Sequence, residues 1–248
     1  MTNDSLQKPV TIKIEKTEFQ KIEDKFVEYY TKNNSQNLSP YIKFMFKEKG
    51  NIQDAANGFN QVLSLMEKKY NAAPNDMKLL RNLVFLGVVE SEWQNKTSLA
   101  NAKGYYQLTQ IAVDDVSELF KIPKIKINDK NIGDQAKYAA LYLTYIYFEV
   151  ADRDLKLTLT AYNVGRTRLK KYMDLCKKSK KKPDYDGFMK YLKPIINKKD
   201  HEQFSNYAPK YYALIYTMRK NNSSFIKLAQ GEITYDELMK KYSIASRK

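Results

Sequence analysis

Apolar residues recur along most of the chain at the three- and four-residue spacing of an amphipathic helix. Phe19, Ile22 and Phe26 set this spacing near the start, and a stretch from 53 to 70 repeats it. Further helices are expected at 39–50, 76–93, 105–120, 132–150, 155–163, 203–220, 223–230 and 234–242. The alternation typical of a strand occurs only at 10–15, as a short edge strand or an ordered tail. The pattern therefore predicts an all-α fold.

A turn-forming stretch, Asn71 to Asp76, divides this series of helices. The sequence predicts an N-terminal helical extension over residues 1–75 and a principal domain, with C-terminal helices, over residues 76–248. A chain of 248 residues can bury a sizeable core in such a domain.

One apolar run, Phe85 to Trp93, contains an acid where the helical pattern expects an apolar residue. At about 100° per residue, Glu90 falls within roughly 40° of the stripe formed by Leu79, Leu83 and Leu86. Burial of this carboxyl would raise its pKa, as a general acid requires. The alternative is a Glu at a helix end that reaches solvent on its flexible stem.

Other acids do not share this face. Glu92 lies about 200° around the helix from Glu90. Asp114 and Asp115 follow Gln107 by a helical stretch and are expected to lie away from Glu90 and Gln107. The sequence therefore offers one candidate acid at this position and no partner carboxylate.

The net charge of +15 favours a polyanionic partner, either nucleic acid, an anionic membrane surface or an acidic cell-wall polymer. The Lys-rich stretch 177–183 is interpreted as a solvated surface turn, and no nucleic-acid recognition motif occurs. No apolar run approaches the roughly 18 residues needed to cross a bilayer, and the N-terminus lacks a signal pattern. We expect either a cytosolic protein or one from which a targeting segment was removed.

The single cysteine, Cys176, excludes an internal disulfide. With one histidine, His201, as the other soft ligand, a zinc or transition-metal site is not expected. No third residue suggests itself to orient a Cys/His catalytic pair. The sequence therefore predicts neither a metal nor a cofactor.

Four separated segments, in order, resemble the catalytic domain of the soluble-type and D-type lytic murein transglycosylases. They are Val89-Glu90-Ser91, Ser98 to Gln107, Ala161-Tyr162-Asn163-Val164-Gly165, and Asn206 to Lys210. The similarity covers about residues 76–216. Tyr105-Tyr106, Gln203 and Phe204 depart from residues common in that family.

The resemblance implies a lysozyme-like helical fold that cleaves the β-1,4 bond between N-acetylmuramic acid and N-acetylglucosamine and leaves a 1,6-anhydromuramoyl end. Glu90 would act as acid and then as base. Ser91 would position Glu90 or the substrate, and Gly104 would let the backbone approach the sugar. The further substrate-binding residues implied are Tyr106, Gln107, Tyr162, Asn163 and Tyr207, with Tyr207 close to the Glu90 carboxyl.

The expected partner is the peptidoglycan glycan strand, whose stem carboxylates suit the positive charge, with no nucleic acid. The substrate places the protein, as a monomer with peripheral association, in the bacterial envelope or periplasm. Two alternatives stay open: a hydrolytic lysozyme- or chitinase-like glycosidase, and a non-catalytic peptidoglycan-binding scaffold of a secretion or flagellar apparatus.

Overall fold

The structure, a computed structural model, describes residues 16–32, 51–94, 96–98, 101–126, 131–221, 223–238 and 240. The strand expected at 10–15 and the helix expected at 39–50 lie outside these residues. Within the described part of the chain, no helix is long and apolar enough to span a membrane.

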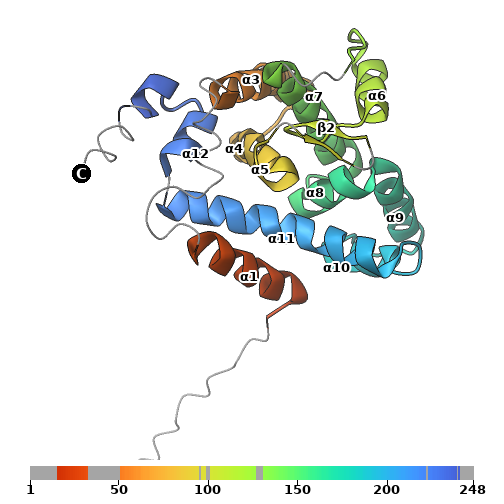
Figure 1. Ribbon diagram of the computed structural model, residues 1–248. Helices are drawn as coiled ribbons and strands as arrows, with labels where there is room; N and C mark the ends of the chain where they lie inside the picture. The colour runs from red at the N-terminus through yellow and green to blue at the C-terminus, as the bar shows by residue number, and fades with distance from the viewer. Residues whose placement is uncertain are drawn as a thin grey trace, which may run out of the picture.

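Helices make up most of the described chain, which confirms the predicted all-α class. In chain order, with most of them labelled in Figure 1, the elements are α1 (Glu18–Lys32), α3 (Asn51–Tyr70), α4 (Pro74–Asn82), η1 (Leu83–Phe85), α5 (Leu86–Ser91), β1 (Lys96–Thr97), β2 (Lys103–Gly104), α6 (Gln110–Phe120), α7 (Ile132–Tyr145), η2 (Ile146–Val150), α8 (Leu155–Val164), α9 (Arg166–Lys178), α10 (Tyr185–Leu192), α11 (Lys198–Asn221) and α12 (Ser223–Ala229). The two short strands pair antiparallel, with Lys96 opposite Gly104.

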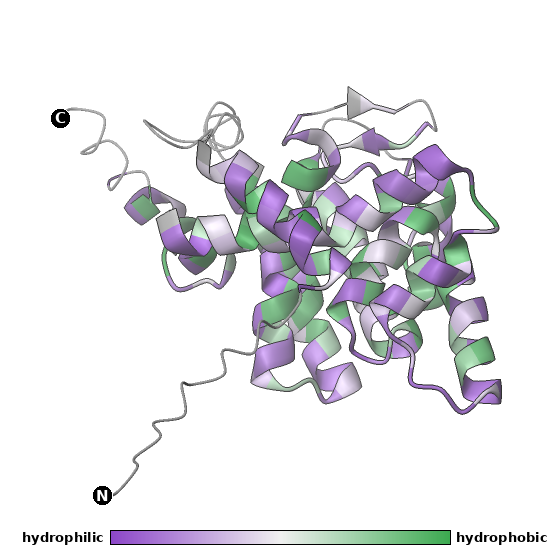
Figure 2. Ribbon diagram, turned by 90° about the horizontal axis from the view of Figure 1, so that it is seen from below, coloured by the Kyte–Doolittle hydropathy of each residue, from purple (hydrophilic) through white to green (hydrophobic). Residues whose placement is uncertain are grey.

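The amphipathic helices bury their apolar faces against one another, and most helices in Figure 2 carry both hydrophobic and hydrophilic residues. The helix α3 packs along α7, where Gly58 brings the two backbones close together. A Cβ on Gly58 would lie 2.5 Å from the carbonyl oxygen of Gly133, so a larger residue would separate these helices. Phe59 on α3 packs against Tyr106, with ring centroids 5.6 Å apart, at the centre of the core.

The N-terminal helices pack onto the helices that follow residue 75. The helix α1 lies along α11, and Phe19 meets the edges of Tyr185 and Tyr212 at centroid distances of 5.1 and 5.5 Å. Asp76, at the predicted boundary, accepts hydrogen bonds from Tyr147 at 2.7 Å and from Arg153 at 2.9 Å. The division at residue 75 stays a prediction, and the two parts share one hydrophobic core.

The helix expected at 76–93 is interrupted. It consists of α4, the 3-10 turn η1 and the short α5, after which Glu92 and Trp93 adopt left-handed conformations. Trp93 turns back over α5, where its backbone N–H donates to the Gly87 carbonyl at 3.0 Å. A Cβ on Gly87 would lie 3.0 Å from the Trp93 ring, so the small residue makes room for the indole.

One other predicted helix begins later than expected, and another keeps its bounds but changes type at its end. The helix expected from residue 105 begins at Gln110, because residues 103–108 form β2 and a turn, and Thr109 caps α6 by accepting from the Ala112 N–H at 3.2 Å. The helix expected at 132–150 ends in the π-helical segment η2. A hydrogen bond of 2.7 Å from Ala151 N to the carbonyl of Ile146, five residues earlier, marks this wider turn.

Candidate functional site

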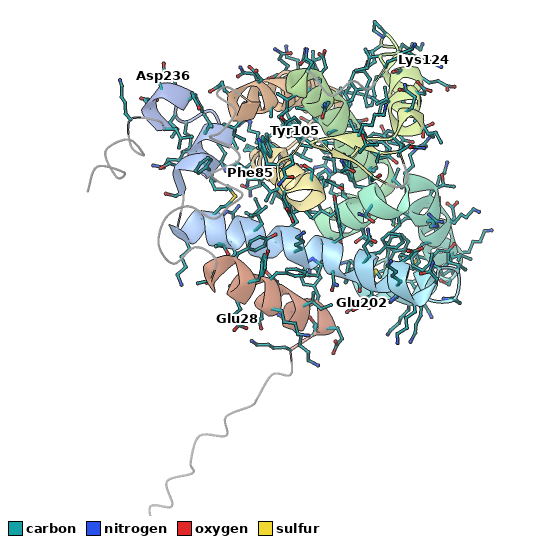
Figure 3. All side chains as sticks on the ribbon, in the orientation of Figure 1. Glu28, Phe85, Tyr105, Lys124, Glu202 and Asp236 are labelled. Carbon is teal, nitrogen blue, oxygen red and sulfur yellow. The ribbon has the colours of Figure 1, made fainter. Side chains whose placement is uncertain are left out.

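An open groove of about 920 Å³ runs between the short β-ribbon, α6 and the helices α8, α9 and α11. The residues that line it include Glu90, Ser98, Ala102, Gln107, Ile111, Ala112, Asp115, Tyr142, Tyr162, Asn163, Gly165, Arg166, Thr167, Asp200, Gln203 and Phe204. Phe85 and Tyr105, labelled in Figure 3, lie among the central helices beside α5, which carries Glu90 to the groove. The site therefore lies where α5 emerges from the hydrophobic core.

Glu90 is partly buried in the groove near the C-terminal end of α5. Its Oε1 accepts a hydrogen bond from the hydroxyl of Tyr207, a buried residue of α11. Lys210, one turn further along α11, places its ammonium 3.4 Å from the neighbouring Val89 carbonyl. The carboxyl thus has a neutral donor in contact and a positive charge nearby.

Burial raises the pKa of Glu90 from its ordinary value of 4.5 to about 7. The hydrogen bond from Tyr207 and the charge of Lys210 act against this rise, because both favour the carboxylate. Since the resulting pKa is near neutrality, the group can give up a proton and take it back, which is what a residue acting as acid and then base requires.

Tyr162 and Asn163, at the end of α8, line the groove with Glu90. The Tyr162 hydroxyl donates to the backbone carbonyl of Tyr106 at 2.8 Å, which fixes the ring against the segment that follows β2. Burial and the adjacent charge of Glu90 raise the pKa of Tyr162 well above its ordinary value. Tyr162 is therefore a neutral hydrogen-bond donor at physiological pH.

Ser91 holds the end of α5 in place from inside the protein. Its buried Oγ lies 2.9 Å from the carbonyl oxygens of both Gly87 and Tyr105, and it accepts from the Gln94 N–H at 3.1 Å. Ser91 does not line the groove. It can position Glu90 through the backbone, whereas the expected direct contact with substrate has no support in this placement.

Gly104 is required by an internal contact. Its φ is +79°, and a Cβ there would lie 2.1 Å from Oε1 of Gln135, the atom that accepts a hydrogen bond of 2.9 Å from the Tyr105 N–H. Gln135 occupies the space beside Gly104. The glycine therefore makes room for this side chain, and it does not serve the expected approach of the backbone to a sugar.

Tyr106 does not line the groove, contrary to the prediction. Its side chain is fully buried between Phe59 and Trp93, and its hydroxyl donates to the Val84 carbonyl at 2.9 Å. Gln107, the next residue, does line the groove, and its Nε2 donates to the Gly104 carbonyl at 2.7 Å. The turn after β2 therefore points consecutive side chains to opposite sides, one into the core and one towards the groove.

Asp115 lines the same groove as Glu90 and Gln107, whereas it was expected to lie away from them, and it forms an ion pair there. Oδ2 of Asp115, on α6, accepts from Arg166 Nε at 3.1 Å and Nη2 at 3.0 Å. Arg166, the first residue of α9, also lies over the Tyr145 ring at 5.5 Å. The partners are 51 residues apart, so no local pattern could have revealed the pair. Glu92 is exposed outside the groove, as its angle on the helix predicted.

Cys176 and His201 are not among the residues that line the groove. Cys176 is buried on α9, and a ring nitrogen of His201 lies 3.0 Å from the Met189 carbonyl oxygen. Among the described residues, no group of three or more His, Cys, Asp or Glu side chains could hold a metal ion.

A comparison with known families matches residues 66–185 to the model of the transglycosylase SLT domain. This span runs from the end of α3 to the start of α10 and includes Glu90, Asp115, Tyr162 and Arg166. Tyr207 and Lys210 lie beyond it, so their relation to Glu90 rests on the geometry alone. A comparison with curated proteins found no match.

Proposed function

We propose that the protein is a peptidoglycan lytic transglycosylase with Glu90 as its catalytic residue, and the match of residues 66–185 to the transglycosylase SLT domain supports this proposal. The proposed reaction cleaves the β-1,4 bond between N-acetylmuramic acid and N-acetylglucosamine and leaves a 1,6-anhydromuramoyl product. One observation carries the proposal: Glu90 lines the groove, its pKa is about 7, and its carboxyl accepts a hydrogen bond from the Tyr207 hydroxyl.

In the first step, protonated Glu90 donates to the glycosidic oxygen. The bond from C1 of the muramoyl residue to that oxygen breaks, and the N-acetylglucosamine leaves with the proton as a free hydroxyl. The cationic C1 is stabilised by the substrate's own acetamido oxygen. Tyr207 and Lys210 favour the carboxylate that Glu90 has become, since the first donates a hydrogen bond to it and the second supplies a nearby positive charge.

In the second step, the Glu90 carboxylate accepts the proton of the muramoyl C6 hydroxyl. The C6 oxygen attacks C1 and closes the 1,6-anhydro ring, which restores protonated Glu90 without consuming water. An intramolecular attack has a high effective molarity, so it has little need of a second activated carboxylate. Tyr162 and Asn163 would bind the reacting sugar. Gln107, which also lines the groove, would contact the glycan as well.

Two other functions compete with this one. A hydrolytic glycosidase would need a second carboxylate to act as nucleophile or to activate water. Asp115 and Asp200 line the groove, but Asp115 is held by Arg166 and Asp200 accepts from the Asn197 amide at 2.8 Å. A scaffold that binds glycan without turnover would have no need of a carboxyl whose pKa lies near neutrality.

Mass analysis of the soluble products from purified peptidoglycan distinguishes these functions. We expect anhydro-muropeptides from the wild type and none from Glu90→Gln. Products with a free reducing end would indicate a hydrolase. No soluble product, with binding retained, would indicate a scaffold. Because peptidoglycan belongs to the bacterial cell envelope, we propose that the protein acts there.

A further inference from the structure

The positive charge of the chain is concentrated in one segment. Residues 166–199, here called the basic lobe, contain 13 of the 43 basic residues and only 3 of the 28 acidic residues. Their net charge of +10 compares with +5 for the other 214 residues, which contain 30 basic and 25 acidic residues. Two thirds of the net charge therefore lies on about one seventh of the chain.

The lobe consists of α9, α10, the turns that flank them and the first two residues of α11, and it lies at the side of the molecule next to α8 (Figure 1). Its apolar side is buried: Tyr172 on α9 packs against Phe188 on α10, with ring centroids 5.3 Å apart. All eleven lysines of the lobe are exposed. Among the described residues, Arg166 is the one basic residue of the lobe that forms an ion pair. Such a surface carries a positive potential that its own acids do not neutralise.

The lobe borders the groove at both of its ends. Arg166 and Thr167, at the start of α9, line the groove, and so does Asp200, immediately after the last lysine of the lobe. A polymer that fills the groove and extends beyond α9 would therefore reach the lobe. This continuity favours one occupant for both surfaces.

We propose that the basic lobe binds the stem-peptide carboxylates of the glycan strand whose sugars occupy the groove. This inference rests on the proposed function, and it adds a second contact region of different chemistry. The chemistry of the lobe fits this ligand because eleven of its 13 basic residues are lysines. Lysine is a flexible point charge without the fixed fork of arginine, which suits carboxylates on mobile peptides better than a rigid planar anion.

The test uses the full chain in the Glu90→Gln background, so that binding is measured without cleavage. The loop variant replaces five exposed lysines, Lys177, Lys178, Lys180, Lys181 and Lys182, by Gln. The control variant makes the same change of charge away from the lobe at Lys25, Lys68, Lys78, Lys124 and Lys227, all of them exposed. Binding to insoluble peptidoglycan is followed by co-sedimentation between about 0.05 and 0.5 M salt, a range over which exposed charges become screened.

We expect the loop variant to bind peptidoglycan about tenfold more weakly at low salt and to lose most of its salt dependence. The control variant should bind within about twofold of its parent. On glycan strands whose peptides have been removed by an amidase, which leaves only the lactyl carboxylate on each muramoyl residue, the loop variant should lose much less binding than it loses on intact peptidoglycan. Equal losses in the two variants, or an equal loss on peptide-free strands, would overturn the inference.

Two further probes address other polyanions, because the lobe also exposes Leu175 and Ile195. Double-stranded DNA and vesicles of anionic phospholipid are offered to the same proteins at the same salt concentrations. If the protein binds DNA or vesicles more tightly than peptidoglycan, and the loop variant loses that binding, then that polyanion and not the stem peptide is the ligand of the lobe. If the wild type forms no anhydro product while the lobe still binds stem peptides, the proposed reaction fails and the binding surface stands.

Discussion

Two carboxylates share one groove and have opposite surroundings. Glu90 accepts a hydrogen bond from a neutral phenol, and burial raises its pKa to about 7. Asp115 instead binds the guanidinium of Arg166 through two nitrogens. A neutral partner leaves Glu90 able to exchange its proton, whereas Asp115 is committed to an ion pair between α6 and α9. The partner of a carboxylate and its burial, more than the mere presence of an acid, therefore decide which carboxylate can act in proton transfer.

Replacing Glu90 should lower the activity far more than replacing Asp115, and this is the largest difference that we expect. Glu90→Gln should lower the initial rate of product release from peptidoglycan at pH 6 by about a thousandfold, because proton transfer by a positioned side chain contributes roughly 10² to 10⁴. Asp115→Asn should cost less than tenfold and leave the product unchanged. A loss of similar size in Asp115→Asn would assign the groove to two-carboxylate hydrolysis.

The unusual pKa of Glu90 should also appear in stability. A carboxyl with a raised pKa contributes stability that is complete below its unfolded pKa of 4.5 and is lost as the pH rises through about 7. The difference amounts to about 3 kcal/mol of unfolding free energy. The stability of Glu90→Gln relative to wild type, measured by urea unfolding, should therefore rise by about that amount between pH 4 and pH 8.

Glu92→Gln is the matched control for that measurement, because Glu92 is exposed two residues away. Its stability relative to wild type should not change over the same range. If the unfolding free energies of Glu90→Gln and wild type changed in parallel with pH, Glu90 would titrate near its ordinary value. That result would contradict its proposed role as the general acid.

Tyr207→Phe removes the hydrogen bond that lowers the pKa of Glu90. Since the first step needs protonated Glu90, the wild-type rate should fall above about pH 7, and this decline should move to higher pH in the variant. The rate at pH 6 should drop about tenfold, the size of one hydrogen bond to a charged group. The measurement is the full pH profile of product release.

Tyr211→Phe provides the comparison one turn along α11. The Tyr211 hydroxyl is buried and has no hydrogen-bond partner among the residues that the structure describes, so its removal should leave the pH profile unchanged. A profile in Tyr207→Phe that coincides with that of Tyr211→Phe would contradict the role given to Tyr207.

The smallest effect is expected at the ion pair. The side chains of Asp115 and Arg166 are 35% and 27% exposed, so solvent screens their attraction. A double-mutant cycle of Asp115→Asn and Arg166→Gln should give a coupling in unfolding free energy of less than about 1 kcal/mol. A coupling of several kcal/mol would mean that the pair is a main support of the groove, and the contrast with Glu90 would weaken.

Most of the described helices could be predicted to within about five residues, but α9, α10 and the interruptions of the other helices could not. The apolar stripe predicted the approach of Glu90 to the core, yet the 3-10 turn at Leu83–Phe85 breaks the helix that was expected there. The pattern of Tyr105 and Tyr106 suggested a helix start, whereas their hydrogen bonds to Gln135 and Val84 hold a turn. These partners lie 30 and 22 residues away, so the local sequence could not predict the hydrogen bonds.

The sequence by itself determined the all-α class, the apolar face that Glu90 shares and the concentration of lysines at 166–199, because periodicity and charge are local properties. The family resemblance pointed to Tyr207, which no periodicity marks. Only the tertiary structure decided that the Tyr106 ring serves the core, that Gly104 accommodates Gln135 and that Asp115 faces Arg166. Each of these depends on residues 22 to 51 positions apart in the chain, which meet only once the helices have packed.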